Sequence, residues 1–509
     1  MSNGRAQNPP ESCTPIENNL PVGWIEITLD QILQTLESGS RPKGGVRGIK
    51  EGVPSIGGEH INENGEFRFE TIKFVPHNFF KQMNHGHIQT GDILIVKDGA
   101  TTGKVALVRD DFPYNPAAVN EHVFICRPEE GIHPLFLFYF LFSKEGQDRI
   151  LENFRGSAQG GINQSFAPRT GALLAPLAEQ KRIAAKVEEL LARVNATKER
   201  LAKVPLILKH FRQAVLAAAC SGRLTSDWRE KQSYIQHAKD LLLSILAERR
   251  QFMQESNPKK RGAPESLHPY REAWDVDPSE FEELPDGWVW ASGEDLFAWS
   301  SGDFLPKKNQ EKGPYPIYGG NGITGYHSEY LADHPTLVIG RVGALCGNVY
   351  ITSDKAWITD NAIYASYVPT KLNLQYVKMV FTQSNLNANA GGSGQPFVNQ
   401  TVLNKVAFPL PPLAEQDEIV CRVESMFKLA DAVEKRVAAA TARAEKLSQS
   451  IMAKAFRGEL VPNEAELARR ERSSYESASD LLARIKSARE PKRSPESDNR
   501  IWGPQKRLK

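Results

Sequence analysis

The sequence contains the same pattern twice. Leu-Ala-Glu-Gln at residues 177–180 recurs at 413–416, and matching residues continue without a gap to Gly222 and Gly458, always 236 positions apart. A repeat of this length predicts two copies of one module arranged about a pseudo-two-fold axis. Such an arrangement suits a target that also has two parts.

Each copy also includes a segment upstream of the repeated residues 177–222 and 413–458. The sequence Leu-Pro-x-Gly-Trp at 20–24 recurs at 284–288, and short β-rich runs with Gly, Pro and Asn turns follow both. At about 150 residues per domain, 509 residues predict three or four units. The expected segments are a disordered N-terminus (1–19), a first globule (20–175), a long helix (176–222), a helical tail and linker (223–283), a second globule (284–410), a second long helix (411–460) and a partly disordered helical tail (461–509). The predicted fold class is α+β.

Apolar residues recur at alternating steps of four and three in both helical segments, which is the 3.5-residue period of a coiled-coil seam. The clearest seam positions are Ile183, Val187, Leu190, Val194, Leu201, Ile419, Val423, Met426, Val433 and Val437; Thr197 and Leu447 also fall on the pattern. We expect an antiparallel pair that separates the globules, with about 50 Å of helix between residues 183 and 215. A dimerisation zipper is the alternative. Pro205, which is Thr441 in the second copy, predicts a kink or break in the first helix only.

Bulk composition narrows the class of protein. The formal net charge is only +2, so any surface for nucleic acid must be local. The five cysteines lie far apart and show no metal-ligand spacing, which favours reduced thiols. No apolar run approaches the ~18 residues of a membrane span. We therefore expect a soluble, cytoplasmic protein without a metal site and without membrane contact.

Catalytic motifs fail on inspection. Residues 98–105 look like a phosphate-binding loop, but Asp98 replaces the first glycine and Val105 replaces the Mg-binding Ser or Thr. Asn8-Pro9-Pro10-Glu11 lacks the aromatic residue of an amino-methyltransferase motif, and Glu179-Gln180-Lys181 is better explained by helix capping than by a nuclease half-site. The chain is therefore predicted to have no catalytic residues and no cofactor of its own.

Polar loops remain as candidate functional residues. Basic clusters beside glycines suit phosphate contacts, and Arg, Asn and Gln suit bidentate contacts to base edges. Because recognition modules should differ where they recognise sequence, the Gln and Asn residues shared by both copies can equally be turn-forming structure. The DNA-binding candidates are Arg41, Lys43, Arg47, Lys97, Thr101, Thr102, Lys104, Gln159, Asn163, Gln164, Lys307, Lys308, Arg341, Asn348, Gln395, Asn399 and Gln400.

Together these residues resemble a known family. Two Pro-Leu-x-Glu-Gln motifs opening heptad helices, each after a globule that begins Leu-Pro-x-Gly-Trp, are similar to the specificity subunit of type I restriction-modification systems. Residues 315–322, Tyr-Pro-Ile-Tyr-Gly-Gly-Asn-Gly, with Gly325-Tyr326 and Arg341-x-Gly343, also resemble target-recognition domains of that family.

The resemblance implies that each globule is a target-recognition domain for one half of a bipartite double-stranded DNA site. The helices would then set the gap, and ~50 Å is compatible with half-sites about one DNA turn, ~34 Å, apart. Implied partners are two methyltransferase subunits using S-adenosylmethionine, and two restriction subunits using ATP and Mg2+ where the system also cleaves DNA. The alternatives are a coiled-coil scaffold that does not bind DNA and a self-contained DNA methyltransferase.

Overall fold

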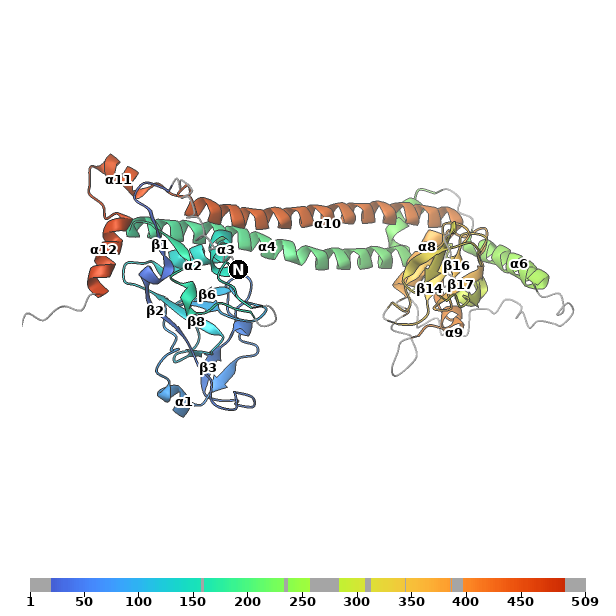
Figure 1. Cartoon of the computed structure of the whole chain (residues 1–509). Helices are drawn as coiled ribbons and strands as arrows, with labels where there is room; N and C mark the ends of the chain where they lie inside the picture. The colour runs from blue at the N-terminus through green and yellow to red at the C-terminus, as the bar shows by residue number, and fades with distance from the viewer. Residues whose placement is uncertain are drawn as a thin grey trace, which may run out of the picture. The chain divides into compact units, whose positions relative to one another are not determined.

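The computed structural model describes residues 20–156, 160–232, 237–256, 283–306, 313–343, 345–384, 386 and 397–489. The chain divides into two compact units. Unit 1 comprises residues up to Leu201 and from Ala440 onward, and unit 2 comprises Ala202–Ala439. Each unit therefore contains one globule, the start of one long helix and the end of the other (Figure 1).

Unit 1 holds the first globule, whose strands form three small sheets ordered β2-β8-β5-β6, β4-β3-β7 and β1-β9. Its strands are β1 (Ile25–Thr28), β2 (Leu33–Ser38), β3 (Val53–Ile56), β4 (Lys73–Val75), β5 (Ile93–Val96), β6 (Val105–Leu107), β7 (Ala118–Val119), β8 (Val123–Pro128) and β9 (Gly171–Leu174). Its helices are η1 (Leu29–Ile32), η2 (Gly58–His60), α1 (His77–Gln82), α2 (Pro134–Phe142), α3 (Lys144–Leu151) and η3 (Gln164–Phe166). Strand β5 is buried along its whole length, because Ile93-Leu94-Ile95-Val96 packs on both faces of its sheet.

Unit 2 repeats this topology strand for strand, with sheets ordered β11-β17-β14-β15, β13-β12-β16 and β10-β18. Its strands are β10 (Val289–Ser292), β11 (Ala298–Ser301), β12 (Tyr315–Gly319), β13 (Gly322–His327), β14 (Leu337–Gly340), β15 (Val349–Ile351), β16 (Trp357–Ile358), β17 (Ala362–Tyr367) and β18 (Ala407–Leu410). Its short helices are η4 (Arg223–Thr225), α5 (Ser226–Arg229), α7 (Gly293–Leu296), α8 (Leu374–Gln383) and α9 (Gln400–Asn404). The repeat in the sequence is thus a repeat of fold, and the α+β class is confirmed.

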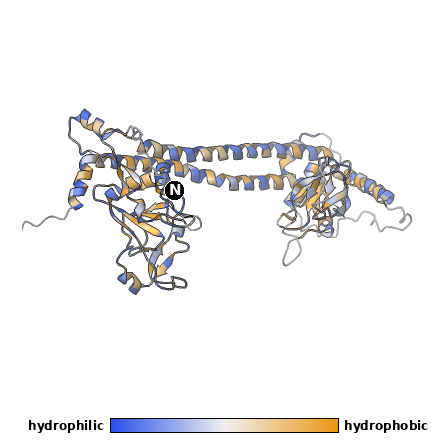
Figure 2. Ribbon diagram, in the orientation of Figure 1, coloured by the Kyte–Doolittle hydropathy of each residue, from blue (hydrophilic) through white to orange (hydrophobic). Residues whose placement is uncertain are grey.

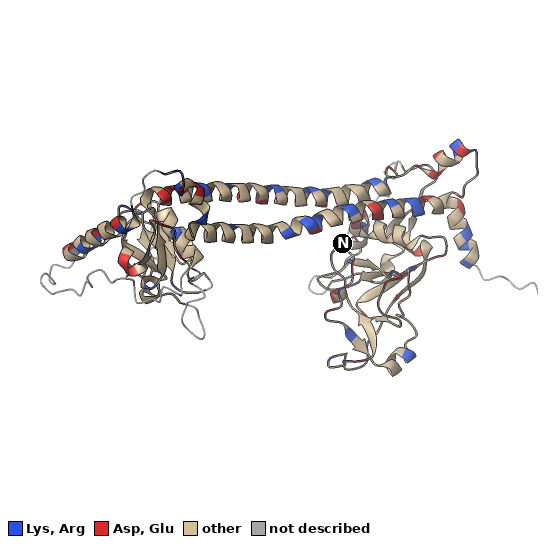
Figure 3. Ribbon diagram, turned by 180° about the vertical axis from the view of Figure 1, so that it is seen from behind, with Lys and Arg blue, Asp and Glu red and all other residues tan. Residues whose placement is uncertain are grey.

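The two long helices are α4 (Leu177–Cys220) and α10 (Leu413–Phe456). In unit 1, Val187 and Val194 of α4 share a core with Ile451 of α10. In unit 2, Val215 near the end of α4 shares a core with Ile419 near the start of α10. The helices therefore pair antiparallel within each unit. Hydrophobic and hydrophilic residues alternate along both helices, and Lys and Arg are interspersed with Asp and Glu (Figures 2 and 3).

The structure departs from the expected helix pattern in two places. Pro205 was expected to kink or break the first helix. Helix α4 continues through Pro205 without a break. Leu447 is 52% exposed and Ser448 is more buried, because the seam moves by one residue near the end of α10. Thr197 is likewise exposed. A straight helix drifts relative to a strict seven-residue repeat, and this drift explains the shift.

Each long helix is followed by shorter helices that pack on a globule of the same unit. In unit 2, α6 (Ala238–Ser256) begins where Ala238 N–H donates to Gly287 C=O. In unit 1, after α11 (Glu464–Glu471), α12 (Ala478–Arg489) begins where Ala478 N–H donates to Gly23 C=O. The apolar faces of α6 and α12 are buried within their own units.

Candidate nucleic-acid interface

The Glu-Gln pair that opens each long helix is fully buried. Gln180 Oε1 accepts from His133 N–H at 2.8 Å, and its amide donates to Ala175 C=O. Gln416 makes the equivalent bonds, with Asn373 N–H and Pro411 C=O. These glutamines therefore fix the start of each helix to its globule, which is a structural role.

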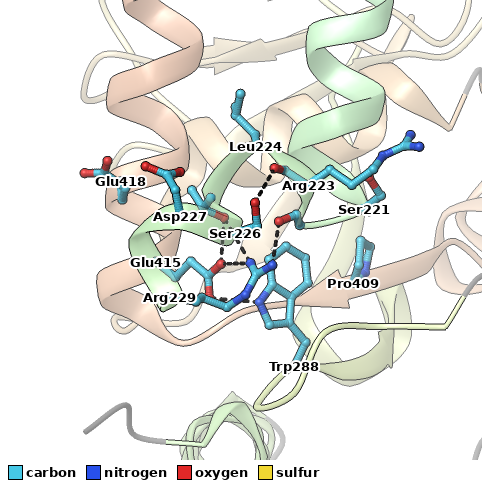
Figure 4. A network of polar contacts seen from close by, with 12 residues as sticks. Ser221, Arg223, Leu224, Ser226, Asp227, Arg229, Trp288, Pro409, Glu415 and Glu418 are labelled. Atoms are coloured by element: carbon cyan, nitrogen blue, oxygen red, sulfur yellow. Dashed lines mark hydrogen bonds and ion pairs between the residues drawn. The ribbon is translucent and has the colours of Figure 1, made fainter. Parts of the chain in front are cut away.

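Glu415 lies at the centre of a buried polar network in unit 2 (Figure 4). Its carboxylate accepts hydrogen bonds from Trp288 Nε1 at 2.9 Å and from Thr225 Oγ1 at 2.7 Å, and it forms an ion pair with Arg229. Trp288 belongs to the Leu-Pro-x-Gly-Trp motif, while Arg229 ends helix α5, after α4. The network thus joins the globule, the start of α10 and the segment after α4.

Glu179 occupies the equivalent place in unit 1 with a different set of partners. It accepts from Trp24 Nε1 and from the backbone N–H of Glu464, both at 2.9 Å. Ala465 stands where the repeat would place Arg229, so this position supplies no cation to Glu179. Burial raises the pKa of Glu179 above its ordinary value of 4.5, and the two hydrogen bonds only partly oppose this.

This raised pKa predicts a pH-dependent stability. Over some pH range the folded chain keeps the proton of Glu179 while the unfolded chain has lost it. The protonated Glu179 therefore contributes fully to the stability of the fold below its ordinary pKa, and this contribution is lost as pH rises through the raised pKa of the folded chain. We expect the free energy of unfolding of the wild type, relative to Glu179→Gln, to fall as pH rises above about 4.5, the ordinary pKa of a glutamate. Urea unfolding at several pH values measures it.

Glu189 supplies the control for that experiment. A hydrogen bond from Lys186 lowers the pKa of Glu189, so the same comparison with Glu189→Gln should give a difference of the opposite sign. A Glu179→Gln difference that stays flat across the series would contradict the account of the buried carboxylate.

The basic loop of the first globule carries three candidates, Arg41, Lys43 and Arg47, all exposed. Gly44, Gly45 and neighbouring Gly48 have φ values between +79° and +90°, which favour glycine and let the backbone approach a surface closely. Arg41 contacts His122 and Glu121. Lys43 and Arg47 have no acidic partner within the described part of the chain, so their charges remain available to an anion such as phosphate.

The glycine turn between β5 and β6 carries Lys97, Thr101, Thr102 and Lys104. Thr102 Oγ1 donates to Gly99 C=O at 2.7 Å, which makes this threonine part of the turn itself. Lys104 lies 3.8 Å from the exposed Glu63 carboxylate, and Lys97 lies over the Phe124 ring. Arg341 and Asn348 flank the corresponding turn of the second globule, where both are partly exposed.

A shallow pocket of about 390 Å3 brings Lys97 together with Asn163 and Gln164. Asn163 Oδ1 accepts from Ser165 N–H, and Asn399 Oδ1 accepts from Val402 N–H in the second copy. The shared asparagines therefore cap short helices, whereas Gln164 and Gln400 are exposed at the same positions of both loops. Four candidates, Gln159, Lys307, Lys308 and Gln395, lie outside the described residues.

Sequence inspection missed the contacts between Arg41, Asp98, Glu121 and His122. His122 lies 81 positions from Arg41 and 24 from Asp98, and these residues form no sequence motif. The link between Trp24 and Glu179 was also missed, although both motifs recur in both copies. Their joint recurrence was the signal that could have suggested the contact.

The described residues contain no group of three or more His, Cys, Asp or Glu side chains placed to hold a metal ion. None of their helices is both long enough and apolar enough to cross a membrane.

Comparison with known proteins identifies the family. The family described as "Type I restriction modification DNA specificity domain" matches residues 21–206 and again 285–440, which together exceed half of the chain. The chain belongs to this family and has the make-up of a type I restriction-modification specificity subunit.

Similar proteins extend over nearly the whole chain. The StySPI specificity subunit of Salmonella potsdam is 29% identical over 481 residues, covering 92% of this chain and 96% of the relative. The EcoKI specificity subunit of Escherichia coli K12 is 29% identical with the same coverage. The HsdS subunit from Thermoanaerobacter tengcongensis shares the fold, with a TM-score of 0.52 at 18% identity over 87% of this chain and 99% of that one. A chain from a type I restriction-modification complex matches with a TM-score of 0.62, also at 18% identity and the same coverage.

Proposed function

We propose that this protein is the DNA-specificity subunit of a type I restriction-modification enzyme, in which each globule recognises one half of a bipartite DNA site. The observation that carries the proposal is the duplication of the globule, with the same strand order in all three sheets of each copy and different polar side chains on the loops. Two similar modules with unlike surfaces suit two unlike half-sites.

The long helices supply the spacing between the half-sites in this proposal. Each is 44 residues long, about 66 Å at 1.5 Å per residue, and each is anchored at its start by a buried Glu-Gln pair. Rigid anchoring keeps the separation of the recognised bases constant.

Two methyltransferase subunits would bind this chain, supply S-adenosylmethionine and modify adenine, and restriction subunits would add ATP- and Mg2+-dependent cleavage. The tails are less available for docking than their amphipathic sequences suggest, because the apolar faces of α6 and α12 pack on their own globules. We therefore assign methyltransferase docking chiefly to the exposed faces of α4 and α10.

A domain exchange tests the division of labour between the globules. Residues 284–410 are replaced by the matching segment of another family member, and the complex with the methyltransferase subunits is used to map methylated sites. We expect one half of the motif to change while the other half is retained. Changes in both halves would contradict independent recognition, and an unchanged motif would contradict a role for the second globule.

A scaffold that does not bind DNA is the alternative, and salt dependence distinguishes it. Sequence-selective binding by the assembled complex that weakens steeply with salt supports the specificity role. Assembly with the methyltransferase without any gain in selective DNA binding supports the scaffold.

A further inference from the structure

The loops around each glycine turn are held by the same backbone hydrogen bonds in both globules. The shared bonds connect the turn to its strand, to the loop before β8 or β17, and to the loop that opens η3 or α9. In the first globule the three bonds are Gly103 N–H to Val96 C=O (2.8 Å), Lys97 N–H to His122 C=O (2.9 Å) and Ile162 N–H to Lys97 C=O (2.7 Å). In the second globule the corresponding bonds, in the same order, are Gly347 N–H to Gly340 C=O (2.8 Å), Arg341 N–H to Asn361 C=O (2.9 Å) and Val398 N–H to Arg341 C=O (2.9 Å). The recognition frame, as we call it, consists of the glycine turn, the loop before β8 or β17 and the loop that opens η3 or α9.

Strand pairing extends the equivalence to one more position. Strands β2 and β8 pair with Ser38 opposite Phe124, and β11 and β17 pair with Ser301 opposite Ile363. Three residues beyond each serine comes Arg41 in the first globule and Phe304 in the second. The frame therefore places Val342 and Asn361 of the second globule where the first has Asp98 and His122, and the segment beyond the serine carries Arg41 in the first globule and Phe304 in the second.

In the first frame the side chains form a polar chain. Arg41 Nη2 lies 3.2 Å from His122 Nε2, and Asp98 Oδ1 lies 2.6 Å from His122 Nδ1. Because arginine can only donate, Nε2 accepts, and the imidazole proton lies on Nδ1, facing Asp98. Glu121 also binds the Arg41 guanidinium through Nε. Arg41 is thus held in one orientation with N–H donors left over, the arrangement that suits the two acceptors of guanine.

In the second frame, exposed apolar side chains stand beside the exposed Asn361. Phe304 is 73% exposed, Val342 37% and Phe397 40%. Val342 and Phe397 are bridge partners, so the two side chains belong to one edge of the frame. Neighbouring exposed apolar side chains, such as Val342 and Phe397, are typical of a surface that a partner covers. In major-groove recognition, apolar side chains contact the 5-methyl group of thymine.

We propose that the recognition frame determines sequence by different chemistry in the two globules, with Arg41 contacting guanine and with Phe304 and Val342 contacting thymine methyl groups. This inference rests on the proposed function, because it takes each globule to bind a DNA half-site. It adds the positions that set specificity and the base class each globule recognises.

The test replaces thymine by uracil, which keeps the hydrogen-bonding groups and lacks only the methyl. The assembled complex with methyltransferase subunits is titrated with duplexes carrying uracil in one half-site at a time. The half assigned to the second globule is the one that exchange of residues 284–410 changes. Uracil there should weaken binding roughly fourfold per methyl lost, while uracil in the other half should change it by less than about twofold.

Two variants connect the effect to the named residues. Phe304→Ala with Val342→Ala should abolish the thymine-uracil difference, and Arg41→Met should relax the preference for guanine in the first half only. All three side chains are exposed or at a loop edge, so folding should be retained, and circular dichroism and co-purification with the methyltransferase subunits confirm it.

The outcomes separate this inference from the proposed function. A complex with no sequence-selective binding at all overturns both. Selective binding to a second half-site that lacks thymine, or that is indifferent to uracil, overturns the inference alone. Loss of methyltransferase association in the Phe304 and Val342 variant would show that a protein covers this surface and would likewise overturn it.

Discussion

Replacing Arg229 with methionine should lower the free energy of unfolding of unit 2 by about 3 kcal/mol, because it leaves a buried carboxylate without its cation. Glu415 is fully buried, and Arg229 is only 17% exposed. The Trp288 and Thr225 hydrogen bonds remain but carry no positive charge. Native-state hydrogen exchange of the whole chain, followed in peptides from the start of α10, measures the loss.

Two further variants show whether the charge is the cause. Combining Arg229→Met with Glu415→Gln removes both charges and should recover part of the stability. Arg223→Met, six residues away, removes an exposed arginine with one side-chain hydrogen bond to Ser221 and should change stability by less than about 0.5 kcal/mol. Equal losses for Arg229→Met and Arg223→Met would contradict the buried ion pair.

The second large effect concerns DNA affinity. Replacing both Lys43 and Arg47 by glutamine should lower the slope of log K against log salt by about two in the assembled complex, since each phosphate contact contributes about 0.9. Between about 50 and 200 mM salt, the wild type should therefore lose roughly tenfold more affinity than the variant. Cognate and non-cognate duplexes should be affected alike, because phosphate contacts carry no sequence information.

A matched pair of cations gives the control. Lys144 and Arg457 are exposed like Lys43 and Arg47, but each forms an ion pair within the chain. Lys144 pairs with Asp148, and Arg457 pairs with Glu459. Replacing these two by glutamine should leave the salt slope unchanged. The same slope change in both double variants would mean that overall charge, and not the loop, governs binding.

The repeat made the fold class and the pairing of helices predictable from the sequence. Shared motifs and a 3.5-residue apolar period survive in both copies because both copies bury the same faces. The pattern was misleading at Leu447, where an apolar residue and its small neighbour Ser448 compete for the seam and the drift of the helix favours the serine.

Contacts made by only one copy could not be predicted from the sequence. Arg229 pairs with Glu415 across 186 positions, and its counterpart in the other copy is alanine, so the repeat gives no hint of the ion pair. The chain of Arg41, His122 and Asp98 likewise depends on three loops that meet only in the folded globule. The tails were predicted to be helical, but the sequence does not say which surface covers the apolar faces of α6 and α12.

Methylation mapping tests the central claim most directly. The chain is co-expressed with the methyltransferase subunit of its own system in a host that lacks adenine methylation, and modified bases are located across the genome. The proposed function predicts one bipartite motif, with methylated adenine in both halves and a gap of constant length. Methylation should depend on the presence of this chain. If it does, but follows a single continuous motif or no motif, the result would contradict recognition by two separate globules.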